Sequence, residues 1–280
     1  MSPPLPASST KHLDVISHPL PRDALTVLPL EQLSSDPDSA KSTGTTGTTL
    51  WLGGQVLSCY LSSLPLPARS PAKPAKRAIE LGAGVGYLSL VLASLGYDVV
   101  STDIPPVLET VLRPNVMVGL DVLRRSTAQT PVVQVCELDW TTTTAHTVTP
   151  GADLDLSVDM IITSDTIYHP DLLPHLFRTI ACISRSSLDN PQRSTPPTVY
   201  LCLERRDSRM VDTALSRAAE FGLHLKRVGH GRVAKCVEKT GWGWAEEDWQ
   251  GVEVYKGRWS QPDTHDSNLT APSDGASANV

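Results

Sequence analysis

Apolar and polar positions alternate along the middle of the chain in two patterns, one typical of buried strands and one typical of helices. Short apolar runs predict five strands, at residues 77–81, 97–103, 132–137, 160–163 and 199–203. Apolar residues at helical spacing predict helices at residues 87–95, 170–184 and 208–221, with a further helix after Pro106 that is interrupted near Pro114. Strands that alternate with helices favour an α/β fold with a mostly parallel sheet covered on both faces.

Two later strand candidates, residues 223–228 and 251–256, have no long helix between them. Parallel neighbours are usually joined through a crossover helix, so these two strands are expected to form an antiparallel pair at the C-terminal end of the fold. The segment between them contains Trp242, Trp244 and Trp249, which are expected to pack in the core.

The two ends of the chain differ from the middle in composition. Residues 1–45 are rich in Ser, Thr, Pro and Asp, and residues 261–280 have almost no large apolar side chain. Neither segment can bury enough surface to offset its loss of conformational entropy, so both are predicted to be mostly disordered tails. Residues 25–28 are the exception, since they are apolar enough to dock as an edge strand. One domain, residues 46–260, lies between the tails.

The composition limits the function classes. With 24 Lys and Arg against 30 Asp and Glu, the 280-residue chain has a net charge of −6, which argues against direct binding of nucleic acid. No run approaches the roughly 20 apolar residues that span a bilayer, and residues 1–6 lack the basic and apolar regions of a secretory signal. The five cysteines are scattered without a CxxC pair, so neither a metal site nor a disulfide framework is expected. We expect a monomeric protein of the cytoplasm, the nucleus or both.

A glycine-rich loop follows the first strand and opens the first helix. It reads Glu80-Leu81-Gly82-Ala83-Gly84-Val85-Gly86, and its glycines let the backbone turn tightly and approach a ligand. Tyr87 stands where a dinucleotide-binding loop has its third glycine, and no Lys-Ser/Thr follows as in a P-loop. The loop instead suits S-adenosylmethionine, whose amino-acid part would lie along it. Asp103, at the end of the second strand, is placed to accept two ribose hydroxyls, and a glycine turn with a helix-capping Asp is the alternative.

Two further strand ends carry polar and aromatic side chains. After the third strand, Trp140 is a candidate to flank an adenine ring and Asp139 to accept its exocyclic amine, although a half-buried Trp at an ordinary strand end gives the same pattern. After the fourth strand come Ser164, Asp165 and Tyr168. Because ligands of open α/β sheets bind beyond the carboxyl ends of strands, Asp165 and Tyr168 are expected in the same crevice as the glycine loop. Helix N-capping by Asp165 is the alternative.

Together these motifs resemble the class I, seven-β-strand methyltransferases, and within them the protein-lysine methyltransferase group called family sixteen. Four motifs carry the resemblance: the tryptophan-bearing entry helix that begins with Leu50-Trp51, the loop Glu80 to Gly86, Leu138-Asp139-Trp140, and Asp165-Thr166-Ile167-Tyr168. The resemblance covers residues 50–256 and implies a Rossmann-like, mostly parallel seven-stranded sheet. The stretches that look most like the branch of methyltransferase-like protein twenty-two are residues 137–140, 203–206 and 252–256.

The family implies a role for each matching residue. Asp165 and Tyr168 would face the acceptor lysine as the catalytic residues, and Asp103 would bind the ribose. The residues implied to hold S-adenosylmethionine are Trp51, Glu80, Gly82, Ala83, Gly84, Gly86, Asp103, Asp139, Trp140 and Ser164. Ser164 departs from the Ala that is usual in the family.

The function implied is S-adenosylmethionine-dependent methylation of a lysine side chain on a specific protein substrate. The glycine loop does not report the acceptor, so a small-molecule or nucleic-acid acceptor, or a cofactor-binding scaffold without catalysis, stays open as an alternative. The Asn/Asp-Pro-Pro-Tyr signature typical of nucleobase or glutamine methylation is missing at residues 164–167. Glu204-Arg205-Arg206, after the fifth strand, either lines the substrate channel or forms a solvated loop. No membrane partner is expected.

Overall fold

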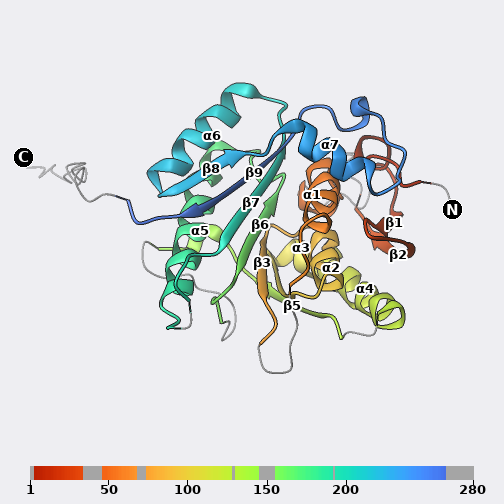
Figure 1. Cartoon of the computed structure of the whole chain (residues 1–280), viewed down its shortest axis with the longest axis horizontal. Coiled ribbons are helices and arrows are strands. Elements are labelled where there is room, and N and C mark those ends of the chain that lie inside the picture. The colour runs from red at the N-terminus through yellow and green to blue at the C-terminus, as the bar shows by residue number, and fades with distance from the viewer. Residues whose placement is uncertain are drawn as a thin grey trace, which may run out of the picture.

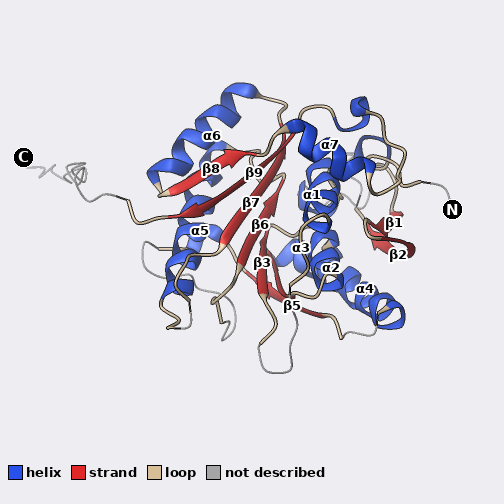
Figure 2. Ribbon diagram, viewed as in Figure 1, coloured by secondary structure: helices blue, strands red, loops and turns tan. Residues whose placement is uncertain are grey.

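A seven-stranded sheet forms the centre of the protein (Figures 1 and 2), with the strand order β5-β4-β3-β6-β7-β9-β8. The structure is a computed structural model that describes residues 3–33, 46–67, 74–127, 130–144, 155–191 and 193–262. The sheet consists of β3 (Arg77–Leu81), β4 (Asp98–Asp103), β5 (Val132–Glu137), β6 (Met160–Ser164), β7 (Thr198–Glu204), β8 (Leu223–Arg227) and β9 (Val252–Trp259). Strands β3 to β7 pair in parallel, and β9 is antiparallel to both β7 and β8. The predicted mostly parallel sheet with an antiparallel C-terminal pair is confirmed.

Helices cover both faces of this sheet (Figure 1). One face carries α1 (Leu52–Ser62), α2 (Tyr87–Ser94), α3 (Pro105–Val107), α4 (Arg113–Ser126) and α7 (His230–Glu238), and the other carries α5 (Leu173–Leu188) and α6 (Ser208–Glu220). Each face has its own large cluster of buried apolar side chains. In α5, Leu173, Leu176, Phe177 and Ile180 recur at helical spacing and are buried, so this apolar stripe holds the helix on the sheet.

The parallel strands give the sheet two chemically different ends. The carboxyl ends of β3, β4, β6 and β7 lie together, and we call this the carboxyl end of the sheet. The opposite side, where these strands begin, is the amino end. Loops at the carboxyl end hold most of the predicted site residues, as expected for an open α/β sheet.

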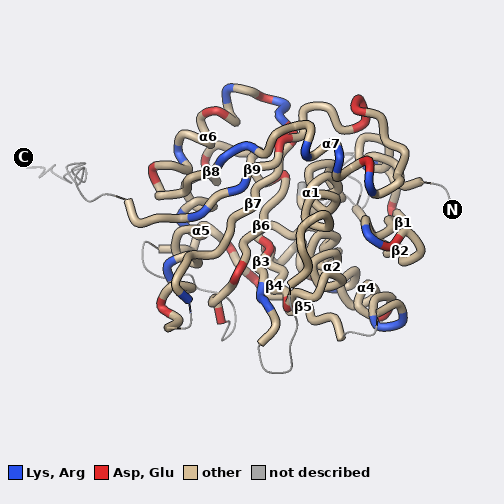
Figure 3. Tube along the Cα trace, in the orientation of Figure 1, with Lys and Arg blue, Asp and Glu red and all other residues tan. Residues whose placement is uncertain are grey.

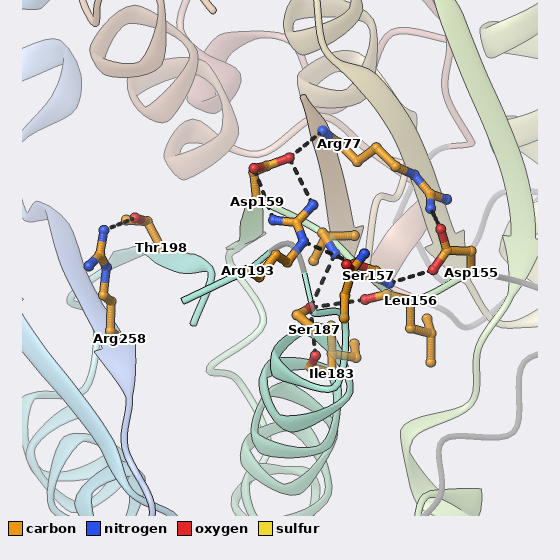
Figure 4. A network of polar contacts seen from close by, with 12 residues as sticks. Arg77, Asp155, Leu156, Ser157, Asp159, Ile183, Ser187, Arg193, Thr198 and Arg258 are labelled. Atoms are coloured by element: carbon orange, nitrogen blue, oxygen red, sulfur yellow. Dashed lines mark hydrogen bonds and ion pairs between the residues drawn. The ribbon is translucent and has the colours of Figure 1, made fainter. Parts of the chain in front are cut away.

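Paired charges hold the amino end together (Figure 4). The Arg193 guanidinium donates to both carboxylate oxygens of Asp159, at 2.9 and 3.2 Å, and to the Ser157 hydroxyl at 2.9 Å. The Arg77 amide donates to the same Asp159 carboxylate at 2.8 Å, and the Arg77 guanidinium pairs with Asp155. This network ties the starts of β3 and β6 to the chain that follows α5.

The N-terminal segment is more ordered than its composition predicts. Strands β1 (Val15–Leu20) and β2 (Asp23–Glu31) form an antiparallel hairpin that packs on α4. Ile16, Leu28 and Leu30 are buried in the core on that side of the sheet. The prediction of a mostly disordered tail over residues 1–45 is therefore wrong for residues 3–33. The apolar side chains of this segment pack on α4 and the core, although Ser and Pro stand between them in the sequence. Residues 34–45 and 263–280 lie outside the described residues, and the domain boundaries at 46 and 260 stay predictions.

The helix irregularity near Pro114 and the burial of the tryptophans were both predicted from local sequence. The helix that follows Pro106 is irregular close to Pro114, as predicted. A π-helical turn, Leu108–Leu112, runs directly into α4, and Pro114 lies in the first turn of α4. Trp242 and Trp249 are buried in the core, as predicted from their segment. None of the helices in the described part of the chain is both long and apolar enough to cross a bilayer.

Candidate active site

A cavity of about 310 Å³ opens at the carboxyl end of the sheet, between the glycine loop and the loops that follow β4 and β6. Ten of the residues predicted to form a site line it: Trp51, Glu80, Gly82, Ala83, Gly84, Asp103, Trp140, Ser164, Asp165 and Tyr168. Four different strand ends and the start of α1 therefore converge on one space. The sequence pattern predicted this convergence, since the ends of parallel strands meet.

The glycine loop leaves no room for side chains where it borders the cavity. Gly82 and Gly84 have φ angles of 69° and 55°, which favour glycine. A Cβ on Gly82 would lie 2.9 Å from the Thr166 methyl group and 3.2 Å from the Trp140 ring, and a Cβ on Gly84 would lie 2.8 Å from the Gly47 carbonyl oxygen. Glycine at both positions is thus required by neighbouring protein atoms, and the loop itself lines the cavity.

Asp103 occupies the end of β4 with its carboxylate turned toward the glycine loop. One oxygen accepts from the Gly84 amide and the other from the Ile104 amide, both at 2.8 Å. Burial raises the pKa of Asp103 to about 6, and these two hydrogen bonds lower it only in part. In the described chain no Lys or Arg lies within ion-pair distance of this carboxylate. Each oxygen keeps a lone pair for a further donor, such as a hydroxyl.

Glu80, at the start of the loop motif, is fully buried beneath the cavity. It accepts a hydrogen bond from the Ser89 hydroxyl, which also contacts the Ser101 hydroxyl at 2.8 Å. Burial raises the pKa of Glu80 to about 8, so the side chain is mainly protonated at neutral pH. A protonated Glu80 has a donor as well as acceptors, which suits it to hold a polar group of a ligand.

Asp165 is the most constrained carboxylate of the site. Its φ of 56° is left-handed, a conformation that Asp and Asn tolerate better than other side chains. Its carboxylate accepts from the Gly54 amide at 3.0 Å, in the first turn of α1. A Cβ on Gly53 would collide with it at 2.5 Å. The capping predicted as the alternative is thus present, but it acts on α1, a helix that precedes Asp165 by about 110 residues.

The surroundings of Asp165 disfavour its charge. Burial raises the pKa of Asp165 to about 7, with the hydrogen bond from Gly54 acting in the opposite direction. Nearby Glu204 raises the pKa further and Arg206 lowers it. Such a carboxyl exchanges its proton near neutral pH, which is common among groups that act in reactions.

A second cavity of about 300 Å³ adjoins the first and shares Trp51, Asp165 and Tyr168 with it. Apolar side chains form much of its wall: Ile167, Leu203, Met210 and Val211. Glu204, Arg206 and Asp207 supply its charged part. Of the two alternatives for residues 204–206, cavity lining holds for Glu204 and Arg206, although the Arg206 side chain is also 52% exposed to solvent. Arg205 points elsewhere and pairs with Glu253 and Asp212.

Trp51 lines both cavities and contacts two cations. The Lys11 ammonium lies 4.3 Å from the centre of a Trp51 ring, and the Arg206 guanidinium lies 4.9 Å from it. Burial, together with Arg206, lowers the pKa of Lys11. Cation–π contacts of this kind hold an indole in place. Sequence reasoning missed Lys11, and no local signal points to it, since it lies 40 positions away in the N-terminal segment.

Two predicted site residues do not line either cavity. Asp139 accepts from the Thr141 amide at 2.8 Å and caps the 3-10 turn Trp140–Thr142, so its prediction as an acceptor for adenine is not supported by this geometry. Gly86 begins α2 with a φ of 80°, and a Cβ there would lie 2.8 Å from the Leu112 side chain. Packing against Leu112 and the left-handed φ account for the glycine here, and its role in holding the cofactor stays a prediction.

Several residues of the first cavity were not predicted. They are Gly47, Thr49, Leu50, Gly54, Val85, Tyr87, Leu88, Ile104, Val107 and Thr166. Gly54 belongs to the entry-helix motif, and its amide is the donor to Asp165. Gly47 lies in a run of Thr and Gly that gives no positional signal in the sequence.

The chemistry of the first cavity fits S-adenosylmethionine. Asp103 offers two carboxylate oxygens for a ribose, and Gly82 to Gly84 offer bare backbone for an amino-acid moiety. The Trp140 indole N–H is buried without a hydrogen-bond partner among the described residues, although its ring faces Gly82. A buried orphan donor beside a cavity indicates a bound group that supplies the acceptor. No grouping of His, Cys, Asp and Glu suited to a metal ion occurs in the part of the chain that is described.

Comparisons with known proteins agree with this chemistry. A profile described as lysine methyltransferase matches residues 35–214. Protein N-lysine methyltransferase METTL21A of Danio rerio is 36% identical over 113 residues, which is 39% of this chain and 44% of that protein. The chain thus spans less than half the length of this curated relative. The branch predicted from residues 137–140, 203–206 and 252–256 stays a prediction.

Solved structures of methyltransferases also match. A putative SAM-dependent methyltransferase from Streptococcus mutans matches with a TM-score of 0.46 and 11% identity, covering 88% of this chain and 55% of that one. The N-methyltransferase NodS from Bradyrhizobium japonicum, in complex with S-adenosyl-L-homocysteine, matches with a TM-score of 0.39 and 13% identity, covering 74% and 85%.

Proposed function

Since the chain belongs to the lysine methyltransferase family, we propose that it transfers a methyl group from S-adenosylmethionine to the side-chain amine of a lysine on a protein substrate. One observation carries the proposal: two cavities meet at Trp51, Asp165 and Tyr168. The first has the groups that suit the methyl donor, and the second is open to an acceptor. Transfer in line between them needs such an arrangement.

The second cavity suits a lysine side chain. Its apolar wall of Ile167, Leu203 and Val211 can contact the aliphatic stem, and its lining includes the carboxyl groups of Glu204 and Asp165. Glu204 is already paired with Arg206, so Asp165 is the carboxyl that remains for the amine. An ionised Asp165 favours a cationic group over an anionic one, which supports an amine substrate over nucleic acid.

S-adenosylmethionine, when bound, supplies an electrophilic methyl group on a sulfonium sulfur, so the protein has to hold, orient and desolvate the reactants. Asp103 and the glycine loop hold the donor. Asp165 orients the incoming ammonium, and Tyr168, which is 49% exposed at the rim of both cavities, shapes the entry. Attack needs the neutral amine, so the lysine has to give up its proton to solvent. Exclusion of water favours this loss, and the nearby carboxylates oppose it.

Composition is the basis of our proposal for the cellular setting. We propose a monomer that works in the cytoplasm or the nucleus, on a protein and without a membrane partner. The acidic net charge of −6 and the scattered cysteines support this proposal.

Transfer of a labelled methyl group from S-adenosylmethionine into a cell lysate tests the function, with Asp103→Ala as the inactive control. Label in a discrete, protease-sensitive band, lost with the variant, supports the proposal, and mass spectrometry then identifies the lysine. Label that nuclease removes, or no label in spite of measured cofactor binding, would contradict it.

A further inference from the structure

A groove of about 670 Å³ runs along β8 and β9 and reaches the start of α7. Six basic side chains line it: His224, Lys226, Arg227, Arg232, Lys256 and Arg258. No Asp or Glu is found among the described residues of its lining, and none of these lining residues belongs to the two cavities of the active site. Figure 3 shows the Lys and Arg segments side by side on β8 and β9. This charge is local, since the whole chain carries −6.

Most of the positive charge in the groove is not neutralised by the protein itself. Arg227 is neutralised, because it pairs with the buried Glu253 at 3.1 Å. Within the described ranges no carboxylate lies at ion-pair distance from the four other cations, Lys226, Arg232, Lys256 and Arg258. A groove with several uncompensated cations attracts anions from solution.

The register of the two strands brings like charges together. Lys226 of β8 lies directly opposite Lys256 of β9, and His224 lies opposite Arg258 on a neighbouring rung. These rungs are two residues apart, so their side chains point to the same face of the sheet. Like charges in directly opposite positions destabilise a sheet. An anion bound between them would relieve this repulsion, so the groove without a ligand favours anion binding.

The first turn of α7 adds to the attraction. Gly229 is the N-cap of this helix and lines the groove, and it has no side-chain oxygen to satisfy the amides that follow. Free amides at a helix start carry positive partial charge. A Cβ added to Gly229 would meet no atom within 4 Å, so the space before the helix is open.

An acidic polypeptide suits this groove better than a nucleic acid does. Nucleic-acid grooves without sequence preference usually add aromatic side chains on which bases stack. The two aromatic residues in this lining, Tyr60 and Trp259, are only 1% and 5% exposed, so no ring is presented for stacking. The charge of the whole chain also repels a long polyanion. A short run of Asp or Glu needs only the cations and the open helix start.

The groove lies within reach of the acceptor cavity along the sheet. Lys256 pairs in register with Tyr200 of β7, four residues before Glu204, which lines that cavity. Four residues of a strand span about 13 Å. This distance is short compared with a protein, so a substrate protein that lies on the groove can extend to the cavity.

We propose that this groove docks an acidic segment of the protein substrate while the acceptor lysine of the same substrate enters the second cavity. The inference rests on the proposed function, since it names the kind of protein that the active site would methylate. It assigns substrate choice to charge complementarity outside the active site.

Fluorescence anisotropy with a labelled decaglutamate peptide tests the groove without any methyl transfer. The variant Lys226→Glu/Lys256→Glu reverses one rung, and Arg125→Glu/Arg217→Glu, at exposed sites on α4 and α6, changes the net charge equally elsewhere. We expect the peptide to bind the wild type and the control alike and the groove variant about tenfold or more weakly, with binding lost at high salt. Equal binding to all three proteins, or tighter binding of a ten-nucleotide oligouridine than of the peptide, would overturn the proposal.

Unchanged affinity for S-adenosylmethionine shows that the groove variant is folded. The lysate assay then separates this inference from the proposed function. Loss of the labelled band with the groove variant alone supports docking. A band that persists unchanged with the groove variant overturns docking while methylation stands. No band with the wild type overturns the docking inference together with the proposed function, even where decaglutamate binds.

Discussion

The carboxylates at the two ends of the sheet have different hydrogen-bond partners. At the amino end, Asp159 accepts from the Arg193 guanidinium through both oxygens and from the Arg77 amide (Figure 4). At the carboxyl end, Asp103 and Asp165 accept only from backbone amides, and burial raises their pKa values to about 6 and about 7. The first arrangement neutralises charge within the fold, and the second leaves acceptors unused.

This difference separates structure from function. A paired carboxylate stabilises the folded chain, and removal of its partner leaves a charge without a counter-ion. An unpaired buried carboxylate destabilises the chain without a ligand, and only a ligand compensates for it. The carboxyl end is thus the part of the sheet where stability has been given up for binding. A substitution at one end should therefore leave the property of the other end unchanged.

Replacement of Asp103 should have the largest effect. Asp103→Ala removes both carboxylate oxygens proposed to accept the ribose hydroxyls, each worth about 1.5–3 kcal/mol as a charged hydrogen bond. We expect the affinity for S-adenosylmethionine, measured by calorimetry, to fall about 1,000-fold. Asp155→Ala at the amino end should leave this affinity unchanged. An Asp103→Ala affinity within about threefold of the wild type would contradict the assignment.

Asp165→Asn should act on transfer and spare binding. Asn tolerates the left-handed φ of 56° and can still accept from the Gly54 amide, so the local fold is kept. The charge that orients the lysine ammonium is lost, and we expect kcat to fall about 100-fold. The affinity for S-adenosylmethionine should stay within about threefold, a loss of under 1 kcal/mol. Asp171→Asn, on the exposed start of the next helix, is the matched control. Unchanged turnover of Asp165→Asn would exclude this role.

Arg193→Met should act only on stability. It leaves Asp159 without its cation in a region where the two side chains are 18% and 29% exposed. We expect the free energy of unfolding in urea to fall by about 2 kcal/mol, less than for a fully buried pair. Arg124→Met, which breaks the exposed pair with Asp121, should cost about 0.5 kcal/mol or less. A loss of methyl transfer by Arg193→Met at low temperature, where the variant is still folded, would contradict the claim that the amino end acts only on stability.

Cofactor binding should depend on the charge of Asp103 and therefore on pH. With a pKa of about 6, the carboxylate is about 90% ionised at pH 7 and about 10% ionised at pH 5. The affinity for S-adenosylmethionine should fall about tenfold over this range as the acceptor is protonated. Asp103→Asn has no such carboxylate, so its weaker binding should be flat between these two pH values. A wild-type affinity that is constant from pH 7 to 5 would show that the charge of Asp103 is not used.

Much of the fold followed from the sequence because its signals are local. The apolar run of β6 and the glycine loop after β3 each predict an element within a few residues, and the ends of parallel strands then converge by geometry. The N-terminal hairpin was missed because its stability comes from distant partners. The Glu31 amide donates to Asn115, and the Asn115 amide group donates back to the Glu31 carbonyl.

The same limit applies to the site. The contact of Asp165 with Gly54 spans 111 positions, and Trp51 gains its two cations from Lys11 and Arg206 at opposite ends of the chain. No spacing rule reaches across such distances. Asp139 was predicted as an acceptor for adenine from its place after the third strand, but it does not line the cavity, and one of its carboxylate oxygens caps a turn. Strand-end position predicts the loop and not the direction of each side chain.

The smallest expected effect is a change in the free energy of unfolding when a carboxylate is replaced by an amide. It tests the account most directly, because the change should have opposite signs at the two ends of the sheet. Asp103 has a raised pKa when folded, so it binds a proton more readily folded than unfolded, and its contribution to stability falls as pH rises from about 4 to about 6. Asn has a single acceptor oxygen, so Asp103→Asn gives up one of the two backbone hydrogen bonds while it removes the buried charge. The charge is the larger effect, and we predict that the free energy of unfolding of the ligand-free protein at pH 7 rises by about 1 kcal/mol while cofactor binding weakens. Asp159→Asn should lower that free energy and leave binding intact. If both variants lose stability and binding together, the division of the sheet into a stabilising end and a binding end is wrong.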